Sequence, residues 1–217
     1  MVTWRIWLHI LSNSGGLNLA EELSRDLQRL IDDTQNNREL ECREFLRYTK
    51  ELLVYPDIPD RFVDVETERI ENLGRSDYLV VADVLRSGDC YRRAYLWELK
   101  APQCFIYEED TRTRLKPSQD FMDAENQLLN YYYGLKENGV FLQQYQISAP
   151  SDISLGGIII GCHRTKVRGN YTEVEKTSCY NIAKRVRDQL YDGKLKVRTW
   201  DEIRSFISAP RRENIIR

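Results

Sequence analysis

The pattern of apolar and polar positions along the chain predicts several amphipathic helices. Between residues 17 and 31, apolar side chains recur at three- and four-residue steps, and charged residues occupy the opposite face. A second helix is predicted from about Arg38 to Leu53, and the following Pro56 and Pro59 would end it. The same periodicity predicts further helices from Pro117-Ser118 to about Gly139, from Ser178 to Leu190 and from Asp201 to Ile207.

Segments rich in β-branched and aromatic residues predict the strands. Asp77–Val84 and Tyr91–Leu99 flank a turn near Gly88 and are expected to form an antiparallel hairpin. Gly156–Gly161 is an apolar run bounded by glycines, which is typical of a strand buried on both faces. Two shorter strands are predicted near residues 62–65 and 195–198. We therefore expect an α/β (α+β) fold with a mixed central sheet that contains the hairpin and is flanked by helices.

Composition narrows the classes of function. The 217 residues include 32 Lys and Arg against 34 Asp and Glu, so a net charge of −2 excludes a molecule-wide positive field for binding a polyanion. The apolar runs are too short to cross a bilayer. Five cysteines without a C-x-x-C pair argue against a disulfide framework and a structural zinc site. These observations predict a soluble cytoplasmic protein with no membrane partner.

Candidate chemistry begins at the end of the second hairpin strand. Side chains alternate between the faces of a strand, so Glu98 and Lys100 share one face and Leu99 points to the other. Antiparallel pairing places Asp77 opposite residues 98 and 99, with about 5 Å between paired Cα atoms. Asp83 shares the face of Asp77 but lies about 20 Å further along the strand. Asp77, Glu98 and Lys100 are therefore predicted to meet at the open end of the hairpin.

Two carboxylates beside an ammonium group suit metal-dependent hydrolysis of a phosphodiester. Carboxylate oxygens are ligands for a hard divalent cation, and a cationic side chain can hold the attacking water. The alternative is that three solvated charges stand at a sheet end. On the following helix, Gln127 and Tyr131 lie four residues apart on one face, at the edge of the apolar stripe. Taken alone, they also fit a surface amide and a core ring.

The ordered set Asp77…Glu98-Leu-Lys100…Gln127-x-x-x-Tyr131 resembles the PD-(D/E)XK nuclease superfamily, in its branch with Gln-x-x-x-Tyr after the core motif. Ser76 stands where that superfamily usually has proline. Four segments between residues 38 and 207 more narrowly resemble the nuclease domain of the Shedu anti-phage defence proteins. They are Glu41-x-x-x-Phe45-Leu46, Ser76-Asp77-Tyr-Leu-Val with Trp97-Glu-Leu-Lys-Ala-Pro102, Gly157-Ile-Ile-Ile-Gly161, and Val197-Arg-Thr-Trp-Asp-Glu-Ile203.

The resemblance implies a restriction-endonuclease-like core and a DNA endonuclease that depends on Mg²⁺, with Mn²⁺ as an alternative cation. Residues 38–217 would form the nuclease domain, and residues 1–37 an N-terminal helical extension, shorter than the regulatory region that Shedu proteins commonly carry. Asp77, Glu98 and the Leu99 carbonyl would bind the metal, Lys100 would orient or activate water, and Gln127 would contact the scissile region. Glu41 corresponds to the helical acidic residue of the family, with Glu39 and Glu44 as competitors. Homo-oligomers, common among Shedu proteins, are expected.

DNA as the partner requires local contacts with phosphate. The candidates are Tyr131 and the basic residues Arg92, Arg93, Arg112, Arg114, Lys116, Arg164, Lys166 and Arg168. Charge clusters of this kind are more often solvated faces. His163 could serve the site, although a single histidine after a buried strand is more often structural.

Two other functions remain open at this level. A nuclease-fold module without catalysis could bind nucleic acid or a partner protein. The chain could also be an oligomerisation protein, because Trp4, Trp7, Leu8 and Leu11 would form an apolar stripe near its start. That stripe would equally suit packing into the core.

Overall fold

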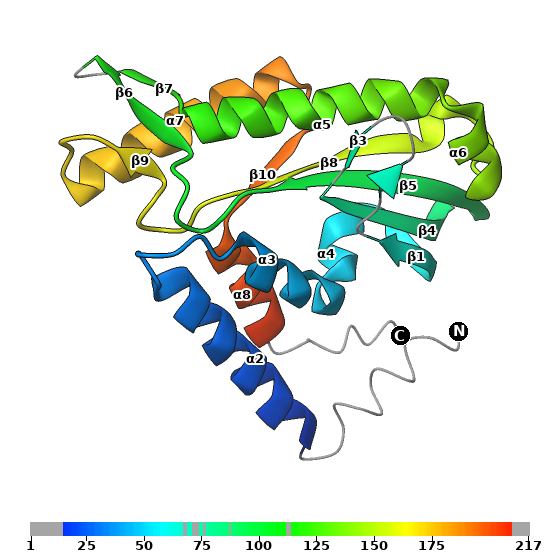
Figure 1. Ribbon diagram of the computed structural model, residues 1–217, viewed down its shortest axis with the longest axis horizontal. Helices are drawn as coiled ribbons and strands as arrows, with labels where there is room; N and C mark the ends of the chain where they lie inside the picture. The colour runs from blue at the N-terminus through cyan, green and yellow to red at the C-terminus, as the bar shows by residue number, and fades with distance from the viewer. Residues whose placement is uncertain are drawn as a thin grey trace.

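The computed structural model describes residues 15–66, 69–70, 74–75, 77–86, 88–111 and 114–209. Its centre is a mixed five-stranded sheet in the order β1-β4-β5-β8-β10 (Figure 1). The strands β1, β4 and β5 pair antiparallel, whereas β5, β8 and β10 pair parallel. Their bounds are Ile58–Glu66 for β1, Tyr78–Arg86 for β4, Asp89–Leu99 for β5, Ile153–Ile159 for β8 and Lys196–Arg198 for β10. The expected mixed sheet with an antiparallel hairpin is confirmed.

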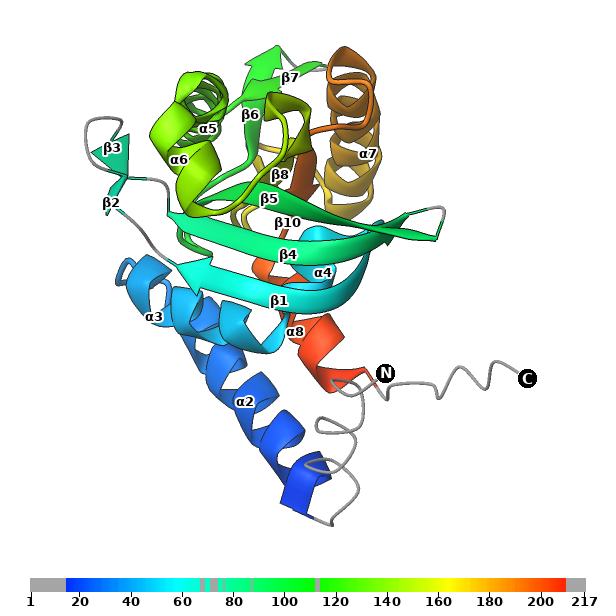
Figure 2. The ribbon, with the colours of Figure 1, turned by 90° about the vertical axis from the view of Figure 1, so that its right-hand side faces the viewer.

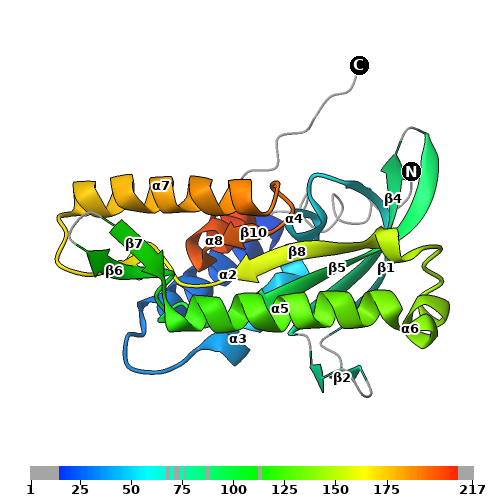
Figure 3. The same ribbon diagram turned by 90° about the horizontal axis from the view of Figure 1, so that it is seen from above.

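Helices cover both faces of this sheet, as Figures 1 and 2 show. On one face lie α5 (Gln119–Glu137), α6 (Gly139–Gln144) and α7 (Glu173–Leu190), and Figure 3 shows α5 and α7 running across it. On the other face lie α2 (Gly15–Asp32), α3 (Glu39–Arg43), the 3₁₀ turn η1 (Glu44–Tyr48), α4 (Lys50–Val54) and α8 (Trp200–Ser208).

The alternation of side chains along β4 and β5 builds two cores. Leu79 and Leu96 pack under α5 in the first core, whereas Val80 and Trp97 pack with α2 and α8 in the second. Because both faces are covered, the central parts of these strands are apolar on both sides, at residues 78–82 and 94–97, as expected for a central strand. Leu27 of α2 belongs to the second core, so residues 15–32 share a core with the rest of the chain.

The hairpin register determines the position of the candidate acids. Tyr78 faces Trp97 and Arg86 faces Asp89, so only two residues connect the strands. Asp77 directly precedes Tyr78 and therefore lies opposite Glu98. The predicted register is confirmed to within one residue, and the second strand begins two residues earlier than expected.

Two predicted helices have different bounds. The helix expected from Arg38 to Leu53 is divided into α3, η1 and α4, because Thr49 leaves helical geometry and its hydroxyl donates to the Leu46 carbonyl at 3.1 Å. The helix expected from Ser178 begins at Glu173. Thr172 caps its first turn through a Thr-x-x-Glu capping box with Glu175.

Small elements outside the main sheet complete the fold. The polar stretch expected after Pro102 contains β6 (Tyr107–Thr111) and β7 (Arg114–Pro117), which form a separate sheet with β9 (Val167–Arg168). The short strands β2 (Arg69–Ile70) and β3 (Gly74–Arg75) pair antiparallel. The Trp-rich start of the chain and Arg112 lie outside the described residues.

Glycine is required where β8 lies between β5 and β10. A Cβ atom at Gly157 would collide with the backbone oxygen of Lys196 on β10, and the φ angle of +155° also disfavours other residues. Gly157, one of the glycines predicted at the edge of a buried strand, thus permits close approach of the β8 and β10 backbones.

Candidate active site

Two acidic side chains meet where the first hairpin strand begins and the second ends. Asp77 precedes β4, and its Oδ2 accepts a hydrogen bond from the Leu99 backbone N–H at 3.0 Å. Glu98 is the penultimate residue of β5, and the charge of Asp77 and a hydrogen bond with it both influence its pKa. The structure therefore brings together the two carboxyl groups that the predicted hairpin register placed opposite each other.

Lys100 joins the hairpin to the covering helix α5. Its Nζ donates to Glu98 Oε1 at 2.8 Å and to Gln127 Oε1 at 3.0 Å. Phe121, Ala124 and Leu128 are the buried residues that set the phase of α5, and Gln127 consequently stands at the edge of its apolar face. Three predicted residues from β5, the segment after it and α5 thus form one connected group.

Glu98 is a buried carboxyl group with an unsatisfied oxygen. The residue is only 2% exposed, and its Oε2 has no hydrogen-bond donor among the described residues. Burial, followed by the charge of Asp77, raises the pKa of Glu98 to about 8, although Lys100 acts in the opposite direction. A cation beside Oε2 would remove the cost of burying this negative charge without a second partner.

Lys100 remains cationic at neutral pH in this environment. Burial acts to lower the pKa of Lys100, but the hydrogen bond and charge of Glu98, with the charges of Asp77 and Glu39, raise it above its ordinary value. A lysine with a raised pKa holds its proton and acts as a positive charge and hydrogen-bond donor.

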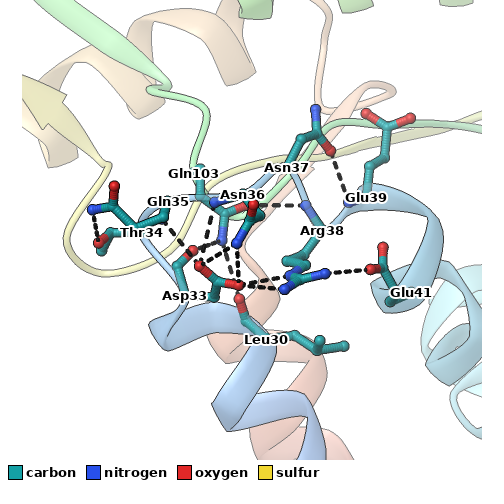
Figure 4. Close-up of polar contacts among 10 residues, drawn as sticks. All are labelled: Leu30, Asp33, Thr34, Gln35, Asn36, Asn37, Arg38, Glu39, Glu41 and Gln103. Carbon is teal, nitrogen blue, oxygen red and sulfur yellow. Dashed lines mark hydrogen bonds and ion pairs between the residues drawn. The ribbon is translucent and has the colours of Figure 1, made fainter.

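A third acid of the site is Glu39, and Glu41, the residue expected from the family pattern, is not part of it. Glu41 is exposed, and its Oε1 accepts from Arg38 at 2.8 Å. Figure 4 shows Glu41 turned toward Arg38 and the carboxyl group of Glu39 directed away from that pair. Burial and the Asp77 charge raise the pKa of the half-buried Glu39, whereas Lys100 and a hydrogen bond from the Ala101 backbone lower it. Glu44, the other competitor, is exposed and pairs with Arg47 at 3.3 Å.

The turn before α3 sets the position of Glu39. Arg38 donates to Asp33 Oδ2 at 2.7 Å, and its backbone N–H donates to Gln103 Oε1 at 3.4 Å. The amide of Gln103, in the loop after β5, donates to the Leu30 carbonyl at 3.0 Å and to the Asp33 carbonyl at 2.5 Å (Figure 4). This network fastens the start of α3 to the segment that carries Lys100. The expected domain boundary near residues 33–38 is therefore a hydrogen-bonded turn.

Arg43 is a basic residue near the acids that the sequence motifs do not indicate. It lies one helical turn after Glu39 on α3, and its charge partly offsets the rise in pKa that burial causes in both Glu39 and Tyr78. Among the described residues, no carboxylate forms an ion pair with its half-buried guanidinium group, and its buried Nε has no hydrogen-bond partner. The spacing of Glu39 and Arg43 at i and i+4 is the sequence signal that could have found it.

The basic residues predicted to contact DNA, as far as the structure describes them, already have partners elsewhere in the fold. Arg92 pairs with Asp83 at 2.8 Å and Arg93 with Asp57 at 2.6 Å. The two arginines lie about 17–20 Å along β5 from Glu98. Arg164 pairs with Asp32 of α2 at 2.7 Å. The remaining described residues of the set pair with acids of the small sheet or stack on a ring: Arg114 with Asp110, Lys116 and Arg168 with Glu108, and Lys166 over Tyr180.

The other predicted residues lie as follows. Leu99 packs its side chain into the second core, while its N–H holds Asp77. Tyr131 lies one turn beyond Gln127 on α5 and is half-buried. His163 contacts Asp201 and is not among the partners of Lys100 or Glu98.

Comparisons with known proteins do not assign the chain to a family. The chain matches no model of a known protein family, and no curated protein matches it. Within the described part of the chain, none of the helices combines the length and the apolar character needed to cross a membrane.

Proposed function

We propose that this protein is a divalent-cation-dependent nuclease that hydrolyses DNA phosphodiester bonds, with a PD-(D/E)XK-type site on a restriction-endonuclease-like core. The observation that carries the proposal is the connected group of Asp77, Glu98, Lys100 and Gln127, in which the buried Oε2 of Glu98 lacks a partner. The resemblance of four segments to the Shedu nuclease domain supports a role in anti-phage defence.

The residues present fit a hard divalent cation. Glu39, Asp77 and Glu98 supply three carboxyl groups against the single ammonium of Lys100, an excess of negative charge when all are ionised. Oxygen donors of this kind are the preferred ligands of Mg²⁺ and Mn²⁺. Asp77 and Glu98 would hold the ion, with the Leu99 carbonyl as a further oxygen donor and the Glu39 carboxyl group as a nearby negative charge. Bound there, Mg²⁺ would supply Lewis-acid stabilisation of charge on the phosphate.

The side chains around the acids have separable roles in hydrolysis. Lys100 carries its proton, so it would orient the attacking water and offset charge that develops on the phosphate oxygens. Gln127 accepts from Lys100 through Oε1, which leaves its exposed amide N–H groups free to donate to the substrate. The guanidinium group of Arg43, which forms no ion pair with the side chains that the structure describes, would contact a phosphate beside the scissile bond.

The direct test is incubation of the purified protein with supercoiled plasmid DNA and Mg²⁺. Nicked and linear products are expected with Mg²⁺ or Mn²⁺, and no products with a chelator. Binding of DNA without metal-stimulated cleavage would contradict the proposal and favour a non-catalytic binding module.

The positions of the two neighbouring glutamates predict different effects of the same substitution. Glu39→Gln is expected to lower the rate of plasmid cleavage by about 10–100-fold, as for other groups that support a metal site. Glu41→Gln serves as a matched control and should cleave like the wild type, because its partner is Arg38 at the surface. A larger loss in Glu41→Gln than in Glu39→Gln would contradict the assignment of Glu39.

Arg43 and Arg47 allow a second matched comparison, in DNA binding. Arg43→Ala is expected to raise the Kd for DNA by about 10–100-fold, because a hydrogen bond to a charged group contributes about 1.5–3 kcal/mol. It should also reduce the slope of log K against log salt by about one phosphate contact. Arg47→Ala, which removes an exposed arginine paired with Glu44, should change neither quantity. Fluorescence anisotropy in the Lys100→Ala background measures both without cleavage.

A further inference from the structure

A second group of metal-ligating side chains lies outside the candidate active site. Cys162 and His163 follow β8, and Asp201 is the second residue of α8. One donor atom from each residue lies within 4.8 Å of the other two. Among the described residues, this is the one set of three Cys, His, Asp or Glu side chains with this spacing. No single stretch of sequence indicates it, because Asp201 is distant along the chain.

The fold holds all three residues in place. The Gly161 carbonyl accepts from the Trp200 N–H at 3.0 Å, and Thr165 Oγ1 accepts from the Cys162 N–H at 2.7 Å. Asp201 Oδ2 accepts from the His163 N–H at 2.6 Å, and Asp201 Oδ1 lies 3.0 Å from His163 Nδ1. The end of β8 and the start of α8 are thus joined at this point, and the donor atoms require no large rearrangement to approach one another.

The chemistry of the group differs from that of the carboxylate cluster. A thiolate, an imidazole and a carboxylate are the ligands of zinc and similar ions, whereas Mg²⁺ prefers oxygen alone. Tetrahedral zinc with bonds of about 2.0–2.3 Å spaces its ligands by about 3.3–3.8 Å, so the group would contract by about 1 Å. The Cys162 side chain is buried, but 54% of the His163 side chain is exposed, so solvent reaches the group and can supply a fourth ligand.

We propose that Cys162, His163 and Asp201 form a binding site for a thiophilic divalent cation of the zinc class, separate from the Mg²⁺ site. On binding, the Cys162 thiol proton is released to solvent and a sulfur–metal bond forms. The ion would tie the end of β8 to α8. It would also restrain the contact of Trp200 with the segment after β5, because Trp200 Nε1 donates to the Lys100 carbonyl at 2.8 Å.

Cobalt provides the test, because Co²⁺ occupies such sites and a thiolate ligand gives it a charge-transfer absorption in the near ultraviolet. The full chain is titrated with Co²⁺ alone, in a buffer with saturating Mg²⁺ that occupies the carboxylate cluster. We expect one equivalent of Co²⁺ to bind with thiolate charge-transfer absorption, and Zn²⁺ to displace it.

Variants assign the ligands. The absorption should disappear in Cys162→Ser. In His163→Ala it should be at least 10-fold weaker at the same Co²⁺ concentration. This second variant changes an exposed side chain, so it avoids the risk of unfolding that comes with replacing the buried cysteine. The absorption should persist in Cys179→Ser, which removes another cysteine, and in Asp77→Asn, which alters only the proposed nuclease site. Absence of the absorption in the wild type, or its persistence in folded His163→Ala, would overturn the proposal and leave a hydrogen-bonded link between β8 and α8.

Discussion

Lys100→Ala is expected to lower the rate of metal-dependent DNA cleavage by about 10²–10³-fold, the loss typical of removing one preorganised charge-stabilising donor. The substitution removes the ammonium group that Glu98 and Gln127 hold from two sides. It also leaves the buried Glu98 without its cationic partner, which raises the pKa of that carboxyl group further. Quantified nicking of supercoiled plasmid under single-turnover conditions measures the effect.

The chain contains a matched control for this experiment. Asp192-Gly-Lys194 has the same acid-x-Lys pattern, but its ion pair of 3.4 Å lies in an exposed turn. Lys194→Ala should cleave DNA at the wild-type rate, and circular dichroism should show that both variants are folded. Equal cleavage by the wild type and a folded Lys100→Ala protein would reject the proposed site.

Glu98→Gln is expected to abolish cleavage while stabilising the metal-free protein at alkaline pH. The substitution removes a negative charge that is buried beside Asp77 and has one unsatisfied oxygen. A buried group without its hydrogen-bond partner costs about 1–3 kcal/mol, and more when it is charged, so a neutral amide at this position avoids the charged part of the cost. The free energy of unfolding should therefore rise by about that amount at pH 8 in chelator. The melting temperature would increase by roughly 2–4 °C for each kcal/mol.

The pH dependence of the same measurement has a definite sign. The pKa of Glu98 rises from 4.5 to about 8 in the folded protein, so between these values the native state keeps a proton that the unfolded state has released. The contribution of Glu98 to stability is thus fully present below about pH 4.5 and is lost as the pH rises toward about 8. Wild-type stability in chelator should fall across this window, and Glu98→Gln should flatten the decline.

Magnesium should reverse the order of stability of the wild type and Glu98→Gln at pH 8. A cation that binds only the folded state stabilises it by about 2.7 kcal/mol at one hundred times its Kd. Mg²⁺ at pH 8 is therefore expected to raise the melting temperature of the wild type and to leave Glu98→Gln nearly unchanged. A wild-type protein whose stability does not respond to Mg²⁺ at pH 8 would contradict a metal site at Glu98.

The candidate site was predictable from sequence where its geometry is local. Asp77 and Glu98 belong to one hairpin, so the alternation of side chains and a short turn suffice to place them opposite each other. Gln127 could be placed because an unbroken apolar stripe defines the phase of α5. Contact between Gln127 and Lys100 required the packing of α5 on the sheet, which periodicity suggests without specifying the residue that meets the strand.

The sequence could not decide which acid of residues 39–44 joins the site. The three glutamates in that stretch have different neighbours, and the α-helix that would order them ends at Arg43 and gives way to a 3₁₀ turn at Glu44. The network of Asp33, Arg38 and Gln103 orients Glu39, and Gln103 lies 65 residues from Arg38 along the chain. Sequence spacing carries no information about a partner at that separation.

By itself, the sequence determined the central hairpin and the facing pair of Asp77 and Glu98, because these follow from side-chain period and short-range pairing. Only the tertiary structure decided which basic side chains are already paired with acids of the protein itself. Arg93 and Arg164 looked like phosphate contacts until the fold paired them with Asp57 and Asp32, 36 and 132 residues away. Folding likewise brought Asp201 to Cys162 and His163. Charge partners distant in sequence are set by packing, since electrostatic contact depends on separation in space and not along the chain.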